Sequence, residues 1–159
     1  MSRDARSVAR VISMVEDNHP DAAAILATLF PRTGSGFAIG LTGAPGSGKS
    51  TLTDQLISHV RSLGDEVGVL AVDPSSPFTG GAILGDRIRM QDHIGDPGVY
   101  IRSMGSRGHL GGVSEATPKA MMVLDAVGFP HVFVETVGVG QAEVEIVESA
   151  DTTIVVVNP

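Results

Sequence analysis

Apolar and polar residues follow two different periods along this 159-residue chain. Between Asp4 and Asp17, apolar side chains recur every three or four positions, which predicts one amphipathic helix. A second, shorter helix is expected after Asp21, and the proline- and glycine-rich residues 31–36 end it. We interpret residues 1–36 as an N-terminal helical extension that packs against the rest of the molecule. A direct part in ligand recognition is the alternative.

From Phe37 onward, short runs rich in β-branched residues alternate with helical patterns. This alternation predicts an α/β fold, a mostly parallel β-sheet flanked by helices, with ligands at the carboxyl ends of the strands. The last run reads as a buried strand that nothing follows, so we expect residues 37–159 to be the front portion of a longer protein. The expected strands are residues 37–42, 67–72, 99–103, 131–135 and 153–157, and the expected helices include residues 51–63 and one capped at Ser114.

The turn between the first expected strand and the following helix has the pattern GxxxxGK[ST], spelled GAPGSGKS. Glycines allow successive backbone N–H groups to turn inward around an anion, and a helix N-terminus adds unsatisfied donors and a favourable dipole. The sequence therefore predicts a loop that binds nucleotide phosphates. Its predicted contacts are Gly43, Ala44, Pro45, Gly46, Ser47, Gly48, Lys49, Ser50 and Thr51.

Three side chains of this loop have distinct predicted roles. Lys49 reaches the β- and γ-phosphates, Ser50 places its hydroxyl on a bridging Mg2+, and Thr51 lies near the α-phosphate. A glycine-rich turn that binds nothing is the alternative. The match of the whole pattern, in a strand, loop and helix context, disfavours that alternative.

Carboxylates at the ends of two other expected strands extend this site. Asp73 follows the second strand, where it can hold Mg2+ or position the attacking water; a turn or N-cap aspartate is the alternative. Glu135 ends the fourth strand, and its side chain can reach the Mg2+ shell through water. Gly138 can offer its N–H to a γ-phosphate. We therefore assign catalysis to Lys49, Asp73 and Glu135.

Three further polar residues have two readings each. Asp86 lies on a short helix after a glycine pair, where it is either a third carboxylate near Mg2+ or the partner of Arg89. Gln141 either orients water or begins a helix. Arg107 belongs to the glycine-rich residues 103–112, which we expect to form a mobile loop. It either neutralises transition-state charge or is a solvated surface arginine.

Composition narrows the classes of function. The net charge is −7, from 18 acidic and 11 basic residues, and only 4% of residues are aromatic. A nucleic-acid partner is therefore not expected, since it would need a basic stripe and often stacking aromatics. The absence of cysteine excludes disulfides and thiolate metal sites, and the five histidines lack the spacing of a transition-metal site. The N-terminal residues form neither a signal peptide nor a membrane span, so we expect no membrane partner and a cytoplasmic location.

Four sequence blocks stand out along the chain: GAPGSGKST, VGVLAVDPSSPFTGGAILGDRIRM, IRSMGSRGHLGG and VETVGVGQAEVEI. Together they resemble one family, the MeaB/ArgK family of P-loop GTPases, and the resemblance covers essentially the whole chain. The family includes the human methylmalonic aciduria type A protein. The resemblance implies a Mg2+-dependent GTPase, with GTP and GDP as ligands, that serves as a chaperone for an adenosylcobalamin-dependent methylmalonyl-CoA mutase. It also implies a homodimer formed through a C-terminal extension.

The resemblance further implies roles for individual residues. Residues 105–112 and 138–143 would belong to nucleotide-dependent switches. The Asn-Lys-x-Asp motif that reads guanine in this family is not among these 159 residues, so the guanine preference rests on the resemblance alone. Two alternatives stay open: an ATP-dependent kinase or ATPase linked to lysine/arginine/ornithine transport, as an older family name suggests, and a nucleotide-binding scaffold without catalysis. The implied Mg2+ shell consists of Ser50, Asp73, Asp86 and Glu135.

Overall fold

The computed structural model describes residues 4–77, 91–93, 95–106, 112–136 and 148–158. Within these ranges, strands form a single sheet in the order β3-β2-β4-β1-β5, and every pairing in it is parallel. The predicted α/β class is therefore confirmed. The strands are β1 (Phe37–Gly43), β2 (Val67–Pro77), β3 (Val99–Ser106), β4 (His131–Thr136) and β5 (Thr152–Val156).

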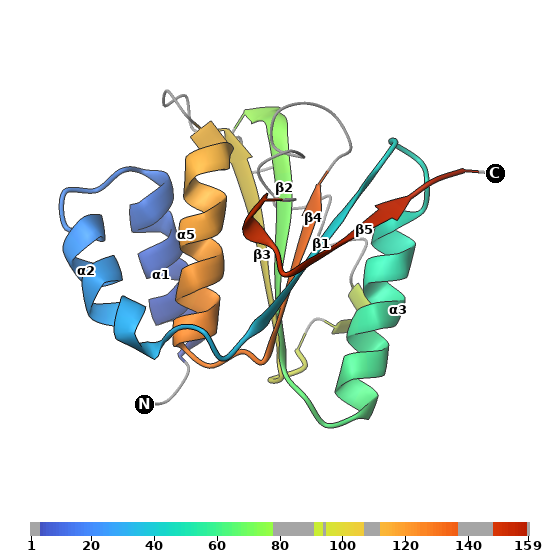
Figure 1. The fold of residues 1–159 in the computed structure, drawn as a ribbon, viewed down its shortest axis with the longest axis horizontal. Helices are drawn as coiled ribbons and strands as arrows, with labels where there is room; N and C mark the ends of the chain where they lie inside the picture. Colours follow the sequence, from blue (N-terminus) through green and yellow to red (C-terminus); the bar gives the residue numbers. More distant parts are fainter. Residues whose placement is uncertain (1–3, 78–90, 94, 107–111, 137–147, 159) are drawn as a thin grey trace.

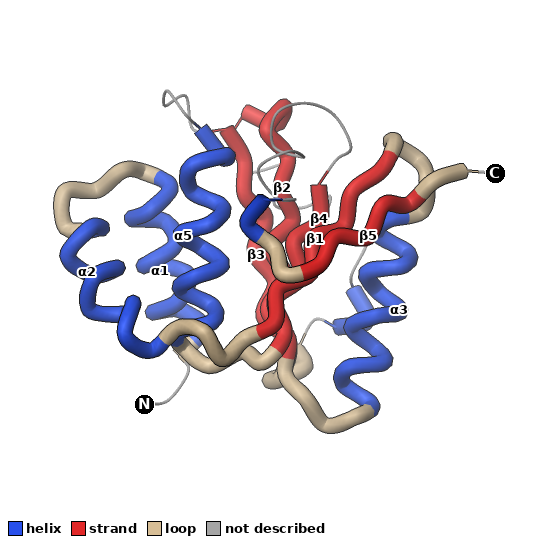
Figure 2. Tube along the Cα trace, viewed as in Figure 1, coloured by secondary structure: helices blue, strands red, loops and turns tan. Residues whose placement is uncertain are grey.

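Helices cover both faces of this sheet (Figure 1). One face packs against α3 (Lys49–Ser62), and the other packs against α1 (Ala5–Glu16), α2 (Ala22–Leu29) and α5 (Gly112–Ala126). Two short 3-10 turns complete the described elements: η1 (Phe30–Arg32) lies between α2 and β1, and η2 (Gln91–His93) precedes β3; both are coloured as helix in Figure 2. Among the helices described, none is long and apolar enough to cross a membrane.

The alternation of side chains along β4 decides which residues face α3. Val132 and Val134 lie in the buried cluster on the α5 side, whereas Phe133 lies in the cluster on the α3 side. Because successive residues of a strand point to opposite faces, Glu135 falls on the α3 side together with Phe133. The same rule places Ala71 of β2 on that side, since Val69 belongs to the α3 cluster.

The N-terminal helices pack as expected. Asp4 caps α1, because its carboxylate accepts the backbone N–H of Ser7 at 3.0 Å, and hydrogen bonds from Ser7 lower the pKa of Asp4. At the other end of α1, Arg102 of β3 donates hydrogen bonds to the buried Glu16 and, at 2.9 Å, to Ser13. The domain boundary at residue 36 stays a prediction. The apolar face of α1 lies in the same buried cluster as α5 and consists of Val8, Ile12 and Val15.

The second strand is longer than predicted, so Asp73 lies within β2 and not at its end. Pairing with β4 stops at Val72, whereas Asp73 still pairs with Gly105 of β3. The pairing of β2 with β3 therefore continues beyond the point where its pairing with β4 ends. Pro74 has no N–H to donate, and the register changes between Asp73 and Pro77.

Two helices begin earlier than predicted. The helix expected at residues 51–63 begins at Lys49, and the helix expected to be capped at Ser114 begins at Gly112. The cap assignment at Ser114 was therefore wrong. The N–H groups of a first helical turn have no partners within the helix, so glycine and serine fit there as well as at the cap. Glycine and serine do not contribute to the apolar period from which the body of a helix is recognised in a sequence.

Candidate phosphate-binding site

The predicted phosphate loop lies where the strand order of the sheet reverses. After β1 the chain crosses β4 to form β2 and β3, and it later returns to place β4 and β5 on the two sides of β1. In open parallel sheets, ligands bind beyond the carboxyl ends of the strands at such a reversal. The loop from β1 to α3 therefore occupies the expected ligand-binding end of the sheet.

Two glycines give this loop its shape. Gly43 ends β1 with φ of 136°, and a Cβ on it would lie 2.1 Å from the carbonyl oxygen of Val156 on β5. Gly48 directly precedes α3 with φ of 95°, a left-handed conformation that side chains disfavour. The chain can thus leave β1 close beside β5 and enter α3 within a few residues.

Lys49 is the first residue of α3, and it is folded back over the loop. Its Nζ atom donates hydrogen bonds to the carbonyl oxygens of Gly43 at 2.7 Å and Ala44 at 2.9 Å, and the residue is only 5% exposed. An ammonium group has three N–H donors. One donor is therefore left for a ligand, which fits the predicted contact with a phosphate oxygen.

Ser50 and Glu135 form the polar centre of the site. The hydroxyl of Ser50 donates a hydrogen bond to Oε1 of Glu135. Glu135 is paired opposite Leu41 of β1 and Ala71 of β2, so it lies between these two strands. The residue is 8% exposed. The contact joins the first turn of α3 to the end of β4.

These residues open onto a cavity of about 640 Å³. A cavity of this size can hold a nucleotide phosphate chain and a cation, and it brings together loop, helix and strand ends. Its lining contains most of the predicted loop and also residues of β2 and β4. The lining residues are Pro45, Gly46, Gly48, Lys49, Ser50, Thr51, Asp54, Ala71, Val72, Glu135 and Thr136.

The donor set at this centre fits Mg2+. Oε2 of Glu135 is buried and has no hydrogen-bond partner among the described residues, although buried carboxylate oxygens are normally paired. Mg2+ prefers oxygen ligands, and it commonly keeps water and phosphate oxygens beside one or two protein ligands. No three His, Asp or Glu side chains gather as a metal site in the part of the chain described. Ser50 and Glu135 therefore fit a cation that arrives with phosphate.

The other predicted site residues have different outcomes. Asp73 is partly exposed and is not among the residues that line the cavity, although its neighbour Val72 is. Ser47 places a buried hydroxyl oxygen in the loop, without a partner among the described residues. The remaining predicted residues lie outside the described ranges, so their assigned roles stay predictions. They are Asp86, Arg107, Gly138 and Gln141.

Two polar residues of the cavity were missed from the sequence. Thr136 follows Glu135, and its hydroxyl lies 3.4 Å from the carbonyl oxygen of Leu41, so it joins β4 to β1. Asp54 lies one helical turn after Ser50 on α3 and also lines the cavity. The spacing of four residues in a helix that starts with the loop lysine was the available signal for Asp54.

Comparison with known proteins supplies the family. A relative from Pyrococcus horikoshii, named a GTPase without further detail, is 57% identical over 156 residues, which are 98% of this chain and 49% of that protein. The GTPase ArgK of Escherichia coli is 42% identical over 149 residues, covering 91% of this chain and 45% of ArgK. The methylmalonic aciduria type A homolog of Caenorhabditis elegans, named as mitochondrial, is 34% identical over 174 residues, covering 100% of this chain and 44% of the homolog.

A solved structure supports the same assignment. The crystal structure of an LAO/AO transport system kinase matches with a TM-score of 0.76 at 29% identity, covering 96% of this chain and 45% of that one. The chain spans about half the length of the curated relatives it matches. The family described as methylmalonyl-CoA mutase-associated GTPase MeaB matches residues 8–159. On this match, the chain belongs to the MeaB family of P-loop GTPases.

Proposed function

We propose that this chain is the phosphate-binding part of a Mg2+-dependent GTPase that hydrolyses GTP to GDP and phosphate. One observation carries the proposal: Lys49, Ser50 and Glu135 share a cavity at the strand ends, and the Ser50 hydroxyl donates to Glu135. A loop lysine, a helix-start hydroxyl and a strand-end carboxylate are the groups that phosphoryl transfer on this architecture needs. Membership of the MeaB family supports the choice of GTP.

Binding of the triphosphate would rest on the loop and Lys49. The backbone N–H groups at the start of α3 and the helix dipole favour the phosphate charge, and the third donor of the Lys49 ammonium is directed to phosphate oxygens. Because Lys49 is almost fully buried, its charge acts in surroundings of low dielectric, where it stabilises developing negative charge more strongly.

Ser50 and Glu135 would hold the Mg2+, and Asp73 and Asp86 would complete its surroundings. When bound, this cation neutralises charge on the β- and γ-phosphates. Glu135 would also be available to orient the attacking water, because its buried carboxylate has an oxygen without a partner in the described part of the chain. Catalysis here is positioning and electrostatics; no covalent step on the protein is needed.

Hydrolysis measured in a single turnover tests this proposal. We expect GTP to be cleaved in Mg2+, ATP to be cleaved much more slowly, and EDTA to stop the reaction. A preference for ATP would overturn the guanine assignment, which rests on the family alone. Absence of cleavage together with tight nucleotide binding would favour the scaffold alternative.

We also propose that the complete protein acts in the cytoplasm as a chaperone for an adenosylcobalamin-dependent methylmalonyl-CoA mutase and forms a homodimer. The family description and the methylmalonic aciduria type A homolog support the link to the mutase. Cosedimentation of the protein with purified mutase, in GDP and in a non-hydrolysable GTP analogue, tests the partner. Equal absence of binding in both nucleotide states would reject this partner, and a monomeric mass would reject the dimer.

A further inference from the structure

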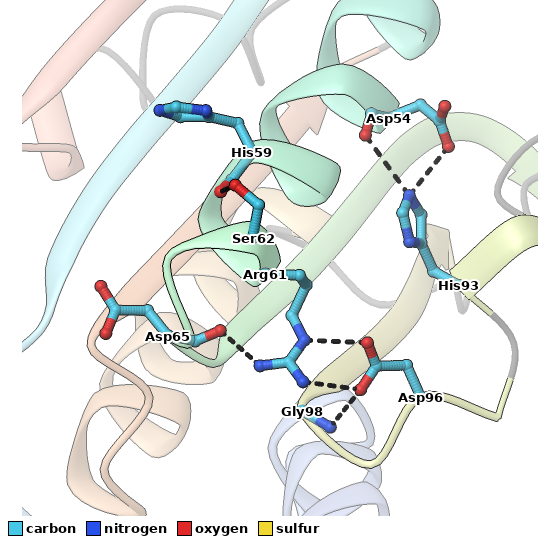
Figure 3. Close-up of polar contacts among 8 residues, drawn as sticks. All are labelled: Asp54, His59, Arg61, Ser62, Asp65, His93, Asp96 and Gly98. Carbon is cyan, nitrogen blue, oxygen red and sulfur yellow. Dashed lines mark hydrogen bonds and ion pairs between the residues drawn. The ribbon is translucent and has the colours of Figure 1, made fainter.

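Two side-chain pairs attach one segment, residues 91–93 and 95–98, to α3 at two levels (Figure 3). Near the start of the helix, His93 contacts Asp54. Near its end, Arg61 contacts Asp96. The two pairs differ in surroundings, because Asp54 lines the phosphate cavity while Asp96 is not among the cavity residues. Only the first pair is therefore placed to act on the site.

His93 binds Asp54 with a single nitrogen. Its Nε2 atom lies 3.0 Å from Oδ1 of the Asp54 carboxylate and 3.3 Å from the Asp54 carbonyl oxygen. Both partners are hydrogen-bond acceptors, so Nε2 carries the proton. His93 is 8% exposed, and two contacts from its Nε2 atom to one residue fix the Asp54 side chain relative to its own helix.

Asp54 is placed to reach a bound cation through water. It lies one turn after Ser50, and side chains four residues apart share one face of a helix. Figure 3 shows that His93 holds one carboxylate oxygen while the other points away from the imidazole. A carboxylate in a phosphate cavity repels phosphate unless a cation or its water lies between them. A site built for phosphate and Mg2+ explains why this charge is held there.

The second pair holds the segment independently of His93. Both nitrogen atoms on one edge of the Arg61 guanidinium contact Asp96, Nε at 2.8 Å and Nη2 at 3.0 Å, and the N–H of Gly98 adds a bond of 2.8 Å. Hydrogen bonding from Arg61 lowers the pKa of Asp96. Loss of the His93 contact would therefore leave the segment attached to α3, and His93 variants are expected to fold.

We propose that Asp54 is a positioning residue of the phosphate site: its carboxylate accepts a hydrogen bond from a water on the nucleotide-bound divalent cation, and His93 holds it in that orientation. The inference rests on the proposed function, because it requires a nucleotide and a cation in this cavity. It adds an acidic residue outside the predicted Mg2+ shell and a histidine that contacts the site only through that residue.

The test is the affinity of the full chain for a fluorescent GDP analogue, measured in Mg2+ and in EDTA. We expect Asp54→Asn to weaken binding about tenfold in Mg2+, the usual effect of losing one hydrogen bond to a charged group, and to change little in EDTA. His93→Leu should weaken Mg2+-dependent binding in the same direction. His93→Gln should restore it, since the glutamine amide can donate from a similar position. The double variant Asp54→Asn with His93→Leu should bind as Asp54→Asn does.

Matched controls separate this role from simple attachment of the segment. Asp96→Asn should lower the melting temperature without changing the affinity in Mg2+, and His59→Leu, on the exposed face of the same helix, should change neither. If His93→Leu lowers only the melting temperature, the positioning role is overturned. If the unaltered chain binds the analogue equally in Mg2+ and EDTA, the proposed Mg2+ dependence fails first. If the unaltered chain binds the analogue more tightly in Mg2+ than in EDTA and Asp54→Asn shows the same difference, the positioning role of Asp54 is wrong while the Mg2+ dependence stands.

Discussion

The hydroxyl of Ser50 donates a hydrogen bond to Oε1 of Glu135, which joins the first turn of α3 to the end of β4. The two residues are 85 positions apart in the sequence. Parallel strands with crossover helices bring them together, because both the loop after β1 and the end of β4 lie at the same edge of the sheet. The contact occupies one oxygen of Glu135 and leaves the other buried without a partner among the described residues.

We expect Glu135→Gln to keep the fold and to lose most of the Mg2+ dependence. The amide retains an oxygen that can accept from Ser50, but it removes the charge that favours a cation. Single-turnover hydrolysis should fall about 100-fold, in the range found when one electrostatic contributor to a transition state is removed. Glu135→Ala should also lose thermal stability. Unchanged hydrolysis in Glu135→Gln would remove this residue from the proposed site.

Lys49→Met should weaken the Mg2+-independent part of nucleotide binding. The substitution keeps an unbranched side chain of similar length and removes the ammonium that bonds to Gly43 and Ala44 and would bond to phosphate. We expect affinity for the fluorescent GDP analogue in EDTA to fall at least about tenfold. Lys119→Met makes the same change of charge on α5, across the sheet, and should have no effect. Equal losses in both variants would mean that net charge alone controls binding.

Glu16→Ala should destabilise the attachment of α1 to the sheet. The carboxylate of Glu16 is buried and accepts a hydrogen bond from Arg102, so its removal leaves a partly buried guanidinium without its ion partner. We expect the free energy of unfolding to fall by about 3 kcal/mol, measured by urea denaturation. Arg10→Ala, at an exposed position of the same helix, should cost less than about 0.5 kcal/mol. A similar small effect of Glu16→Ala would show that the apolar face alone holds α1.

Asp125→Ala should loosen the connection between η1 and β1. The carboxylate of Asp125, on α5, accepts the backbone N–H groups of Gly34 at 2.5 Å, Ser35 at 3.3 Å and Gly36 at 2.7 Å. Three donors would lose their acceptor together, so we expect a loss of about 2 kcal/mol and faster amide hydrogen exchange at residues 34–36. Exchange that is unchanged at these amides would show that the turn holds its shape without the carboxylate.

Asp96 makes a pH-dependent contribution to stability. Hydrogen bonding from Arg61 lowers the pKa of Asp96 below its ordinary value, and a lowered pKa stabilises the fold at pH values above the pKa of the unfolded chain. This contribution is present at neutral pH and is lost as the pH falls below about 4 through the lower folded-state pKa. Asp96→Asn should therefore be less stable than the unaltered chain at pH 6, and the difference should shrink in acid. A difference that is constant with pH would show that the carboxylate charge does not contribute.

Local patterns in the sequence predicted the elements well where one physical cause dominates. The apolar period predicted for residues 4–17 agrees with α1, because amphipathic burial acts within a few residues. The β-branched runs predicted all strands of the described sheet, but the ends of β2 and β3 were placed too early, so residues 103–106 belong to β3 and not to the expected mobile loop. The last strand, expected to be buried, is the partly exposed β5 at the end of the strand order. A strand ends where its partners end, and Gly105 of β3 continues the pairing beyond Val72.

The sequence by itself determined the phosphate loop and the parallel α/β class, since glycine conformation, strand period and helix period are local properties. Only the tertiary structure decided which distant side chains meet on α3. The sheet register brings Glu135 to Ser50, and the packing of η2 against α3 brings His93 to Asp54. These contacts depend on distances between segments that are remote in the chain. No local pattern encodes such distances, because they arise only when the strands and helices pack together.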